Sequence, residues 1–413
     1  MTSHLVGGIS SLGRALPKLH GQDFLVERAE GARLWDIDGN SYIDTAMGFG
    51  ATVLGHAFPS VVDAVGEALH QGPMPAFAHR REEAAADALA RHTGDLDRVV
   101  FVNSGSEAVH LACRIARAET KRPRIAKMAA GYDGWYDAVA FGTAGSSEAA
   151  MTANSRPGNA EFSLLRFNDF DDVDRLFAED PGIAAVIVEP VLANAGTILP
   201  APGYLNHLQT VAHRHGALVI ADEVLMGFRL ACGLTSHALG LRPDLATLGK
   251  AIGSGIAVAA VVGTTKVMAG VERGQVVRAG TYSGNPVACA AVIATVAELE
   301  TADYAGLLGR GDALRVNITR IGDSFGCPVS TSGFGNVFTM WFSPEPPTTY
   351  AQALTMADSA RTQRLHRELR QRGVLIMPFA FGRVFLSFAH DVETTSGLES
   401  AVGDALGVLA NVA

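Results

Sequence analysis

The amino-acid sequence predicts an α/β protein, with a large domain on a mostly parallel central sheet and a smaller α+β domain formed by both chain ends. Short, continuous apolar runs at 99–102, 184–188 and 217–222 alternate with Ala-rich helical stretches, and such runs are typical of parallel strands that helices cover on both faces. After about residue 302 the pattern changes, and long helical stretches mix with strands. The expected boundaries are 1–55 for the N-terminal part of the small domain, 56–301 for the large domain and 302–413 for the C-terminal part.

Turn signals and apolar runs place the elements in chain order. Residues 32–44 predict two short strands joined at Asp38-Gly39, a strong hairpin signal. The strand at 99–102 leads through the turn NSGSEA into a helix-like stretch. The other expected strands are 184–188, 217–222 and 257–262 in the large domain, and 336–342 and 384–390 in the small domain.

Composition and charge exclude several classes of function. The 413 residues carry a net charge of -9 at pH 7, which gives no basic surface for nucleic acid or an anionic membrane. The longest apolar run, 251–263, is shorter than the roughly twenty residues that span a bilayer. The N-terminus lacks the basic start and apolar stretch of a signal peptide, and the four cysteines are too scattered for a disulfide framework. We therefore expect a cytoplasmic protein.

Ligands of open α/β sheets bind at the carboxyl ends of the strands, and the turn NSGSEA (103–108) lies at such an end. Its small residues let backbone N–H groups converge, and the start of the following helix adds a positive dipole, so a phosphate group fits there. A serine-capped helix with Glu107 in its first turn explains the same residues without any ligand. The turn alone does not separate these two interpretations.

Three further groups follow strands. Lys250 is the only charged residue from Leu245 to Thr265, and a desolvated lysine has a lowered pKa and acts as an amine nucleophile, although its ammonium could also extend to water. Asp222, at the end of a strand, and Tyr132 are weak signals when taken singly. Together with a phosphate cradle they form the set that a pyridoxal phosphate site requires: a Schiff-base lysine, an acid for the pyridine nitrogen and an aromatic that stacks on the ring.

Seven motifs, in one order, resemble the class III (subgroup II) aminotransferases of the fold type I pyridoxal phosphate enzymes, and most closely the glutamate-1-semialdehyde 2,1-aminomutase pattern. The motifs are GARLWDIDGNSYID, GHAFPSVVDAV, FVNSGSEAV, VIVEPV, ADEVLMGFR, PDLATLGKAIGSG and AGTYSGNP. The pair DEVxxGFR and PDLxTLGK is highly specific, and the resemblance covers nearly the whole chain. It implies a fold type I transferase with pyridoxal 5′-phosphate as its cofactor.

The resemblance also implies residue roles. Lys250 matches the lysine that forms the Schiff base, and Asp222 matches the partner of the pyridine nitrogen. The other matched cofactor residues are Ser104, Gly105 and Ser106 at the phosphate, Tyr132 and Val224 on the two ring faces, Asn194 near the ring hydroxyl, and Thr281 as a phosphate ligand from the neighbouring subunit. The last role implies a homodimer with shared active sites.

Departures from the aminomutase pattern concern the substrate. Asp133 stands where that pattern has histidine, and Phe49 stands where it has tryptophan. Arg14 aligns with the arginine that holds the substrate carboxylate, and the alternative is a surface residue near a chain end. Residues 142–160 match a mobile active-site lid, and Arg383 lies in the region of substrate recognition without a clear counterpart.

We expect an aminotransferase that moves an amino group between an amino-acid-like donor and a small carbonyl substrate. The alternative is aminomutase-type transfer within one substrate, because one fold supports both chemistries. A catalytically silent protein that binds pyridoxal phosphate is disfavoured because Lys250 and Asp222 are both present. No metal site is expected, since His213 and His215 lack partner ligands.

Overall fold

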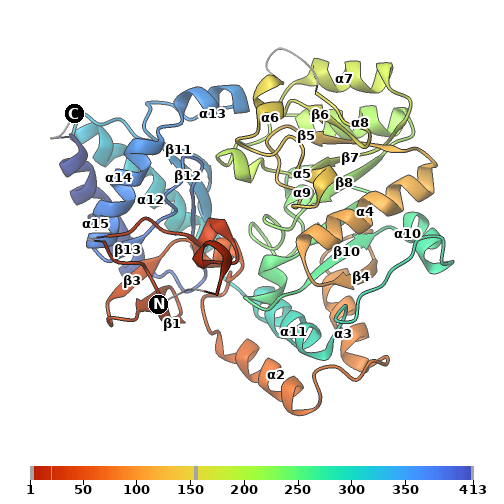
Figure 1. The fold of residues 1–413 in the computed structure, drawn as a ribbon, viewed down its shortest axis with the longest axis horizontal. Coiled ribbons are helices and arrows are strands. Elements are labelled where there is room, and N and C mark those ends of the chain that lie inside the picture. The colour runs from red at the N-terminus through yellow and green to blue at the C-terminus, as the bar shows by residue number, and fades with distance from the viewer. Residues whose placement is uncertain (1–3, 20, 153–156, 411–413) are drawn as a thin grey trace.

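A computed structural model describes residues 4–19, 21–152 and 157–410, and these form a larger and a smaller lobe (Figure 1). The strands of the larger lobe are β4 (Arg98–Val102), β5 (Arg124–Met128), β6 (Phe162–Leu165), β7 (Ile183–Val188), β8 (Leu218–Asp222), β9 (Leu245–Leu248) and β10 (Ala259–Gly263). They form one seven-stranded sheet in the order β4-β10-β9-β8-β7-β5-β6.

The prediction of a mostly parallel sheet is confirmed, with one reversed strand. Strands β6, β5, β7, β8 and β9 pair in parallel, whereas β10 is antiparallel to both β9 and β4. The reversal follows from the short link of residues 249–258, because a parallel return needs a crossover of a dozen or more residues. The strand expected at 257–262 is therefore present, at Ala259–Gly263, but it runs against its neighbours.

Helices cover both faces of this sheet, as the continuous apolar strands predict. Alternate strand residues such as Ile187 and Ile220 pack with α4 (Gly105–Thr120) and α10 (Thr265–Glu272), and the intervening residues pack with the other group of helices. That group comprises α3 (Arg80–Ala90), α7 (Phe170–Glu179), α8 (Tyr204–Arg214) and α11 (Pro286–Glu300), with α2 (Pro59–His70) against α11. The remaining short helices of this lobe are α5 (Asp137–Ala140), α6 (Ser147–Met151), α9 (Thr235–Ala238), η3 (Ala193–Ala195) and η4 (Lys250–Gly253).

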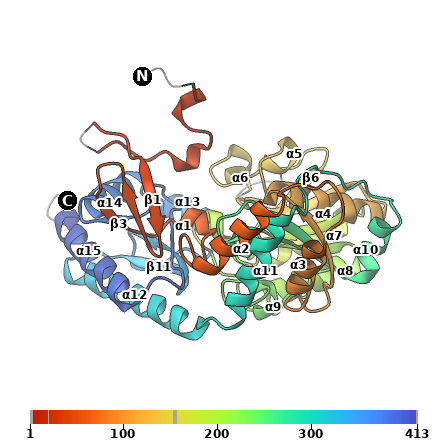
Figure 2. The same ribbon diagram turned by 90° about the horizontal axis from the view of Figure 1, so that it is seen from below.

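The smaller lobe combines both ends of the chain (Figures 1 and 2). The N-terminal strands β1 (Val26–Glu30), β2 (Arg33–Asp36) and β3 (Ser41–Asp44) share a sheet with the C-terminal β13 (Val374–Leu375), in which Val374 pairs with Ile43. A second sheet contains β11 (Ser330–Phe334), β12 (Val337–Trp341) and β14 (Arg383–Phe385). The helices are η1 (Val6–Gly8), η2 (Leu12–Arg14), α1 (Met47–Gly50), α12 (Tyr304–Ser324), α13 (Tyr350–Met356), α14 (Ser359–Gln371) and α15 (Val392–Ala410).

Two local predictions in this lobe are confirmed. Strands β2 and β3 form the expected antiparallel hairpin, with Gly39 at φ +84° in its turn, a left-handed conformation that glycine adopts without steric cost. Strand β12 lies within the strand expected at 336–342, which is the second confirmed prediction, whereas the strand expected at 384–390 is shorter, because β14 ends at Phe385. We propose domain boundaries near residues 55 and 301, where α1 gives way to α2 and α11 to α12. Within the described ranges, none of the helices is both long and apolar enough to cross a membrane.

Candidate active site

A cavity of about 370 Å³ lies at the carboxyl edge of the seven-stranded sheet. Residues that follow β4, β5, β7, β8 and β9 line it, as expected for a ligand site in an open α/β sheet. The cavity brings together these predicted cofactor residues: Ser104, Gly105, Ser106, Tyr132, Asn194, Asp222, Val224 and Lys250. Thr281, Arg14, Phe49 and Arg383 do not line it.

The start of α4 agrees with both interpretations of the NSGSEA turn, the serine-capped helix and the phosphate site. The Ser104 hydroxyl accepts a hydrogen bond from the Glu107 amide at 3.3 Å, and the Glu107 carboxylate accepts from the Ser104 amide at 3.1 Å. This capping box leaves the Gly105 and Ser106 amides without a protein acceptor in the part of the chain that the structure describes. Two free N–H groups and the helix dipole therefore suit an anionic ligand such as phosphate.

Close packing holds the cradle against its neighbours. A Cβ added at Gly105 would lie 2.8 Å from Cγ1 of Val224, so only glycine permits this approach. Gly134, at φ +121°, brings the loop after Tyr132 onto Ser106, whose hydroxyl accepts a hydrogen bond from the Trp135 amide at 3.3 Å. The loop and the helix start are thereby fixed together, with Tyr132 beside the cradle.

Asp222 ends β8 and is buried. Its Oδ1 accepts hydrogen bonds from the Val224 amide at 3.0 Å and from Oγ1 of Thr247 at 2.9 Å. Burial raises the pKa of Asp222 well above its usual value, and the nearby acids Asp133 and Glu189 raise it further. A carboxylate in this state binds a proton or a cationic ring nitrogen strongly.

Lys250 follows β9 and is partly buried, with a backbone φ of +44°. A left-handed φ is uncommon for a residue with a side chain, and such conformations concentrate at functional sites. Burial, followed by the charge of Arg383, lowers the pKa of Lys250 to about 8, although Asp222 and Glu189 oppose the shift. Lys250 is therefore a substantially deprotonated amine at mildly alkaline pH, as a nucleophile requires.

Glu189, which we did not single out from the sequence, is buried at the cavity wall. Its two oxygens accept hydrogen bonds from the Tyr132 amide at 2.9 Å and from Nδ2 of Asn194 at 3.3 Å. Burial, followed by the charge of Asp133, raises the pKa of Glu189 to about 7. The sequence feature that could have indicated Glu189 is an acid directly after a fully apolar strand. The same feature indicated Asp222.

The predicted substrate residues lie outside the lining of the cavity. Arg383 does not line the cavity, but its charge acts on Lys250 and Glu189, and its Nη1 donates to the Ala193 carbonyl at 3.3 Å. Phe49 packs into the apolar cluster that contains Leu225 of the cavity wall. Arg14 is exposed on η2. Of the expected lid at 142–160, residues 153–156 lie outside the described residues.

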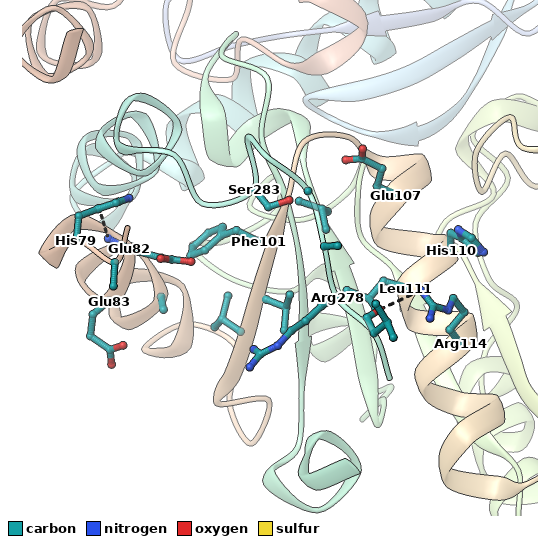
Figure 3. A pocket seen from close by; sticks show the side chains of 18 residues that line it. His79, Glu82, Glu83, Phe101, Glu107, His110, Leu111, Arg114, Arg278 and Ser283 are labelled. Carbon is teal, nitrogen blue, oxygen red and sulfur yellow. Dashed lines mark hydrogen bonds between the residues drawn. The ribbon is translucent and has the colours of Figure 1, made fainter. Parts of the chain in front are cut away.

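A second cavity, of about 670 Å³, lies on the other side of the α4 start (Figure 3). Residues of α3, β4, α4 and the segment 277–283 line it, and Arg114 of α4 donates to the Val277 carbonyl at 3.0 Å. Thr281 is exposed on this segment, between the lining residues Gly280 and Ser283. Thr281 itself is not among the residues that line the first cavity.

Comparison with known proteins identifies the family. The sequence matches the family "Aminotransferase class-III" over residues 17–390. The chain belongs to this family. It is accordingly an enzyme of pyridoxal 5′-phosphate-dependent amino-group transfer. The residues present fit that cofactor, because two unpaired amides, a buried acid and a lysine with a lowered pKa share one cavity.

Similar proteins include enzymes of more than one reaction type. A glutamate-1-semialdehyde 2,1-aminomutase of Gemmatimonas aurantiaca is 38% identical over 97% of this chain and 94% of the relative. The solved structure of an omega-transaminase from Sphaerobacter thermophilus has a TM-score of 0.89 at 29% identity, covering 98% of this chain and 94% of the other. A β-phenylalanine aminotransferase from Variovorax paradoxus has a TM-score of 0.88 at 28% identity, covering 99% and 92%. The fold type I architecture is thereby confirmed.

The lowered pKa of Lys250 leads to a testable pH dependence. The free amine reacts with the aldehyde of pyridoxal phosphate, so the rate of covalent attachment to cofactor-free protein should rise with pH around a midpoint near 8. An ordinary lysine would give a midpoint above 10. The measurement is borohydride trapping at a series of pH values, followed by mass spectrometry. Lys250→Ala is the control and should yield no trapped peptide; a midpoint near 10 would contradict the prediction.

Proposed function

We propose that this protein is an intermolecular aminotransferase that moves an amino group between an amino-acid-like donor and a small carbonyl substrate. The observation that carries the proposal is that Lys250, Asp222 and Tyr132 share one cavity with the start of α4. Bound pyridoxal phosphate supplies an electron sink beside the amino group that is transferred. The protein's own residues bind it, orient it and move protons.

Each side chain has a role that its surroundings support. Asp222, fixed by two hydrogen bonds, holds the proton on the ring nitrogen. Lys250 binds the cofactor covalently and, with a pKa of about 8, gives and takes a proton near neutral pH. The remaining proposed contacts are Tyr132 and Val224 on the ring faces, Asn194 near the ring hydroxyl, and Ser104, Gly105 and Ser106 at the phosphate.

The choice of an intermolecular reaction rests on the substrate side of the cavity. Arg14, the residue that the aminomutase pattern assigns to the substrate carboxylate, is exposed and does not line the cavity. Asp133 introduces an acid into the cavity wall. Aminomutase-type transfer within one substrate is the second candidate, and the 38% identity to an aminomutase favours it.

One assay separates these candidates. Glutamate-1-semialdehyde supplied without a donor should give little or no 5-aminolevulinate, whereas amino donors should support turnover of other small carbonyl compounds. Product is measured by chromatography, with Lys250→Ala as the inactive control. Efficient isomerisation without a donor would establish the aminomutase instead. A cofactor that never converts to its pyridoxamine form with any donor would indicate a catalytically silent binding protein.

We further propose that Arg383 binds the carboxylate of the substrate. Its Nε is buried and has no hydrogen-bond partner within the described chain, and its charge acts on Lys250. A buried donor without a partner costs free energy, which an incoming carboxylate offsets. Arginine also has the bidentate geometry that matches a carboxylate.

Arg383→Met should raise KM for alanine as donor by about 10- to 100-fold, because charge-assisted hydrogen bonds contribute about 1.5–3 kcal/mol. The matched control is a donor without a carboxylate, 1-phenylethylamine, whose KM should change little. Steady-state kinetics with both donors provide the measurement. An equal loss for the two donors would contradict a carboxylate-binding role and indicate a general effect on Lys250.

We propose that the protein is a cytoplasmic homodimer in which Thr281 of each subunit contacts the phosphate in the other. Three large apolar side chains beside the second cavity support this: Phe77 is 84% exposed, Val277 67% and Tyr282 64%. Such exposed apolar groups, when they lie close together, are typical of protein interfaces. Nε2 of His79, two residues after Phe77, also contacts the Gly284 carbonyl at 2.8 Å, so the two segments adjoin.

Hybrid dimers of Lys250→Ala and Thr281→Ala subunits test the arrangement. Each hybrid has one site that can react, the one with an intact Lys250. If Thr281 acts across the interface, that site should bind pyridoxal phosphate with wild-type affinity, because its Thr281 comes from the other subunit. If Thr281 acts within its own subunit, the site should show the weaker affinity of the Thr281→Ala homodimer. Affinity is measured by cofactor titration of purified hybrids.

A further inference from the structure

A second buried lysine lies close to the cavity. Lys127, in the middle of β5, is fully buried. Its Nζ lies 3.2 Å from Oδ2 of Asp133 and donates to the Val139 carbonyl at 2.7 Å and the Gly131 carbonyl at 3.4 Å. The ammonium thus has three partners, as a buried charge requires.

Asp133 is the acid of this ion pair and also part of the cavity wall. Its side chain is 2% exposed, and Asp133 lines the cavity, whereas Lys127 does not. Oδ2 makes no hydrogen bond within the described residues, so the ion pair with Lys127 is the interaction that holds it. Asp133 therefore lies at the cavity, whereas its ion-pair partner Lys127 lies outside the cavity lining.

Three carboxylates converge at this edge of the sheet. Asp133, Glu189 and Asp222 follow β5, β7 and β8, which are adjacent strands. A Cβ added at Gly131 would lie 3.3 Å from Oδ2 of Asp133 and 3.7 Å from Oε1 of Glu189, so these two acids approach the same point. Closely spaced acids compete for ionisation, and among the residues that the structure describes, Asp133 is the one of the three with a buried cation at ion-pair distance.

We propose that the Lys127–Asp133 ion pair is a positioning unit that keeps a fixed negative charge beside Asp222 and thereby strengthens protonation of the cofactor's ring nitrogen. This inference rests on the proposed role of Asp222. The physical reason is that the Lys127 ammonium, 3.2 Å from Oδ2, compensates the charge of the buried Asp133 carboxylate in place of water, and a carboxylate charge at this position favours a bound proton at its neighbours. The raised pKa of Asp222, to which Asp133 contributes, agrees with this arrangement.

The other titratable groups that face Asp133 do not act as its counter-ion in place of Lys127. From α4 and the segment after β5, the Cys113 thiol and the Tyr136 hydroxyl face it, and burial raises the pKa of both, so they stay neutral. Lys250 lies in the same cavity, but its amine is the group that binds the cofactor. Lys127 is therefore the cation that fixes the charge of Asp133.

Nitrogen-15 NMR of ring-labelled pyridoxal phosphate, bound to the full-length protein, tests the inference. Asp133→Asn removes the fixed negative charge and leaves Lys127⁺ without its partner. The pH midpoint for loss of the ring-nitrogen proton should fall by about one unit or more, a tenfold or larger loss in proton affinity. Lys127→Met/Asp133→Leu removes both charges and should give a smaller fall, together with near wild-type thermal stability.

Controls separate this inference from a structural effect and from the role of Asp222. Asp180→Asn breaks another ion pair of a buried acid, with Arg124 at the start of β5, and should leave the midpoint unchanged. If the Lys127→Met/Asp133→Leu protein keeps the wild-type midpoint, the pair is only structural and the inference is overturned. That variant decides the question even if Asp133→Asn does not fold. If Asp222→Ala keeps a protonated ring nitrogen, the proposed role of Asp222 is wrong instead.

Discussion

Removal of water from a few charged side chains at one edge of the seven-stranded sheet determines the chemistry of this site. The same burial lowers the pKa of Lys250 and raises the pKa of Asp222 and Glu189, because in each case it penalises the charged form. The amine becomes a nucleophile and the acids become proton holders without any specialised residue type. The cofactor brings an aldehyde, a ring nitrogen and a phosphate into this site. The side chains that it meets there are in the protonation state that the apolar surroundings favour.

The topology explains why these groups meet. Parallel strands deliver their carboxyl ends to one edge, so the acids after β7 and β8 and the lysine after β9 arrive together although they are distant in sequence. The short link after β9 contains the left-handed residue Lys250 and leads directly into the antiparallel β10. From the smaller lobe, Arg383 acts on Lys250, so both lobes contribute to the electrostatics of one cavity.

The sequence sufficed for features that local patterns encode. Apolar runs predicted the strands. Lys250 alone left two interpretations open, and the site was predicted only from the combined residues and the family resemblance. The reversal of β10 depends on the length of the link 249–258, which no local apolar pattern encodes. The Lys127–Asp133 pair was missed because Arg124 shares the short strand with Lys127, so Lys127 does not stand out as an isolated charge as Lys250 does. Its partner follows from the loop that Gly134 folds back onto Ser106. The exposed position of Arg14 depends on how the N-terminal segment packs, which no local pattern encodes.

The turn NSGSEA shows how a structural and a functional interpretation of the same residues can both hold. A helix start has four amides without helical partners. The Ser104 hydroxyl satisfies the amide of Glu107, and the Glu107 carboxylate satisfies the amide of Ser104 itself. The Ala108 amide already makes the first helical bond, to the Ser104 carbonyl. The amides of Gly105 and Ser106 then remain, at the cavity and close to Val224. The cap therefore does not compete with an anion for these donors; it fixes the helix start in the orientation that presents them.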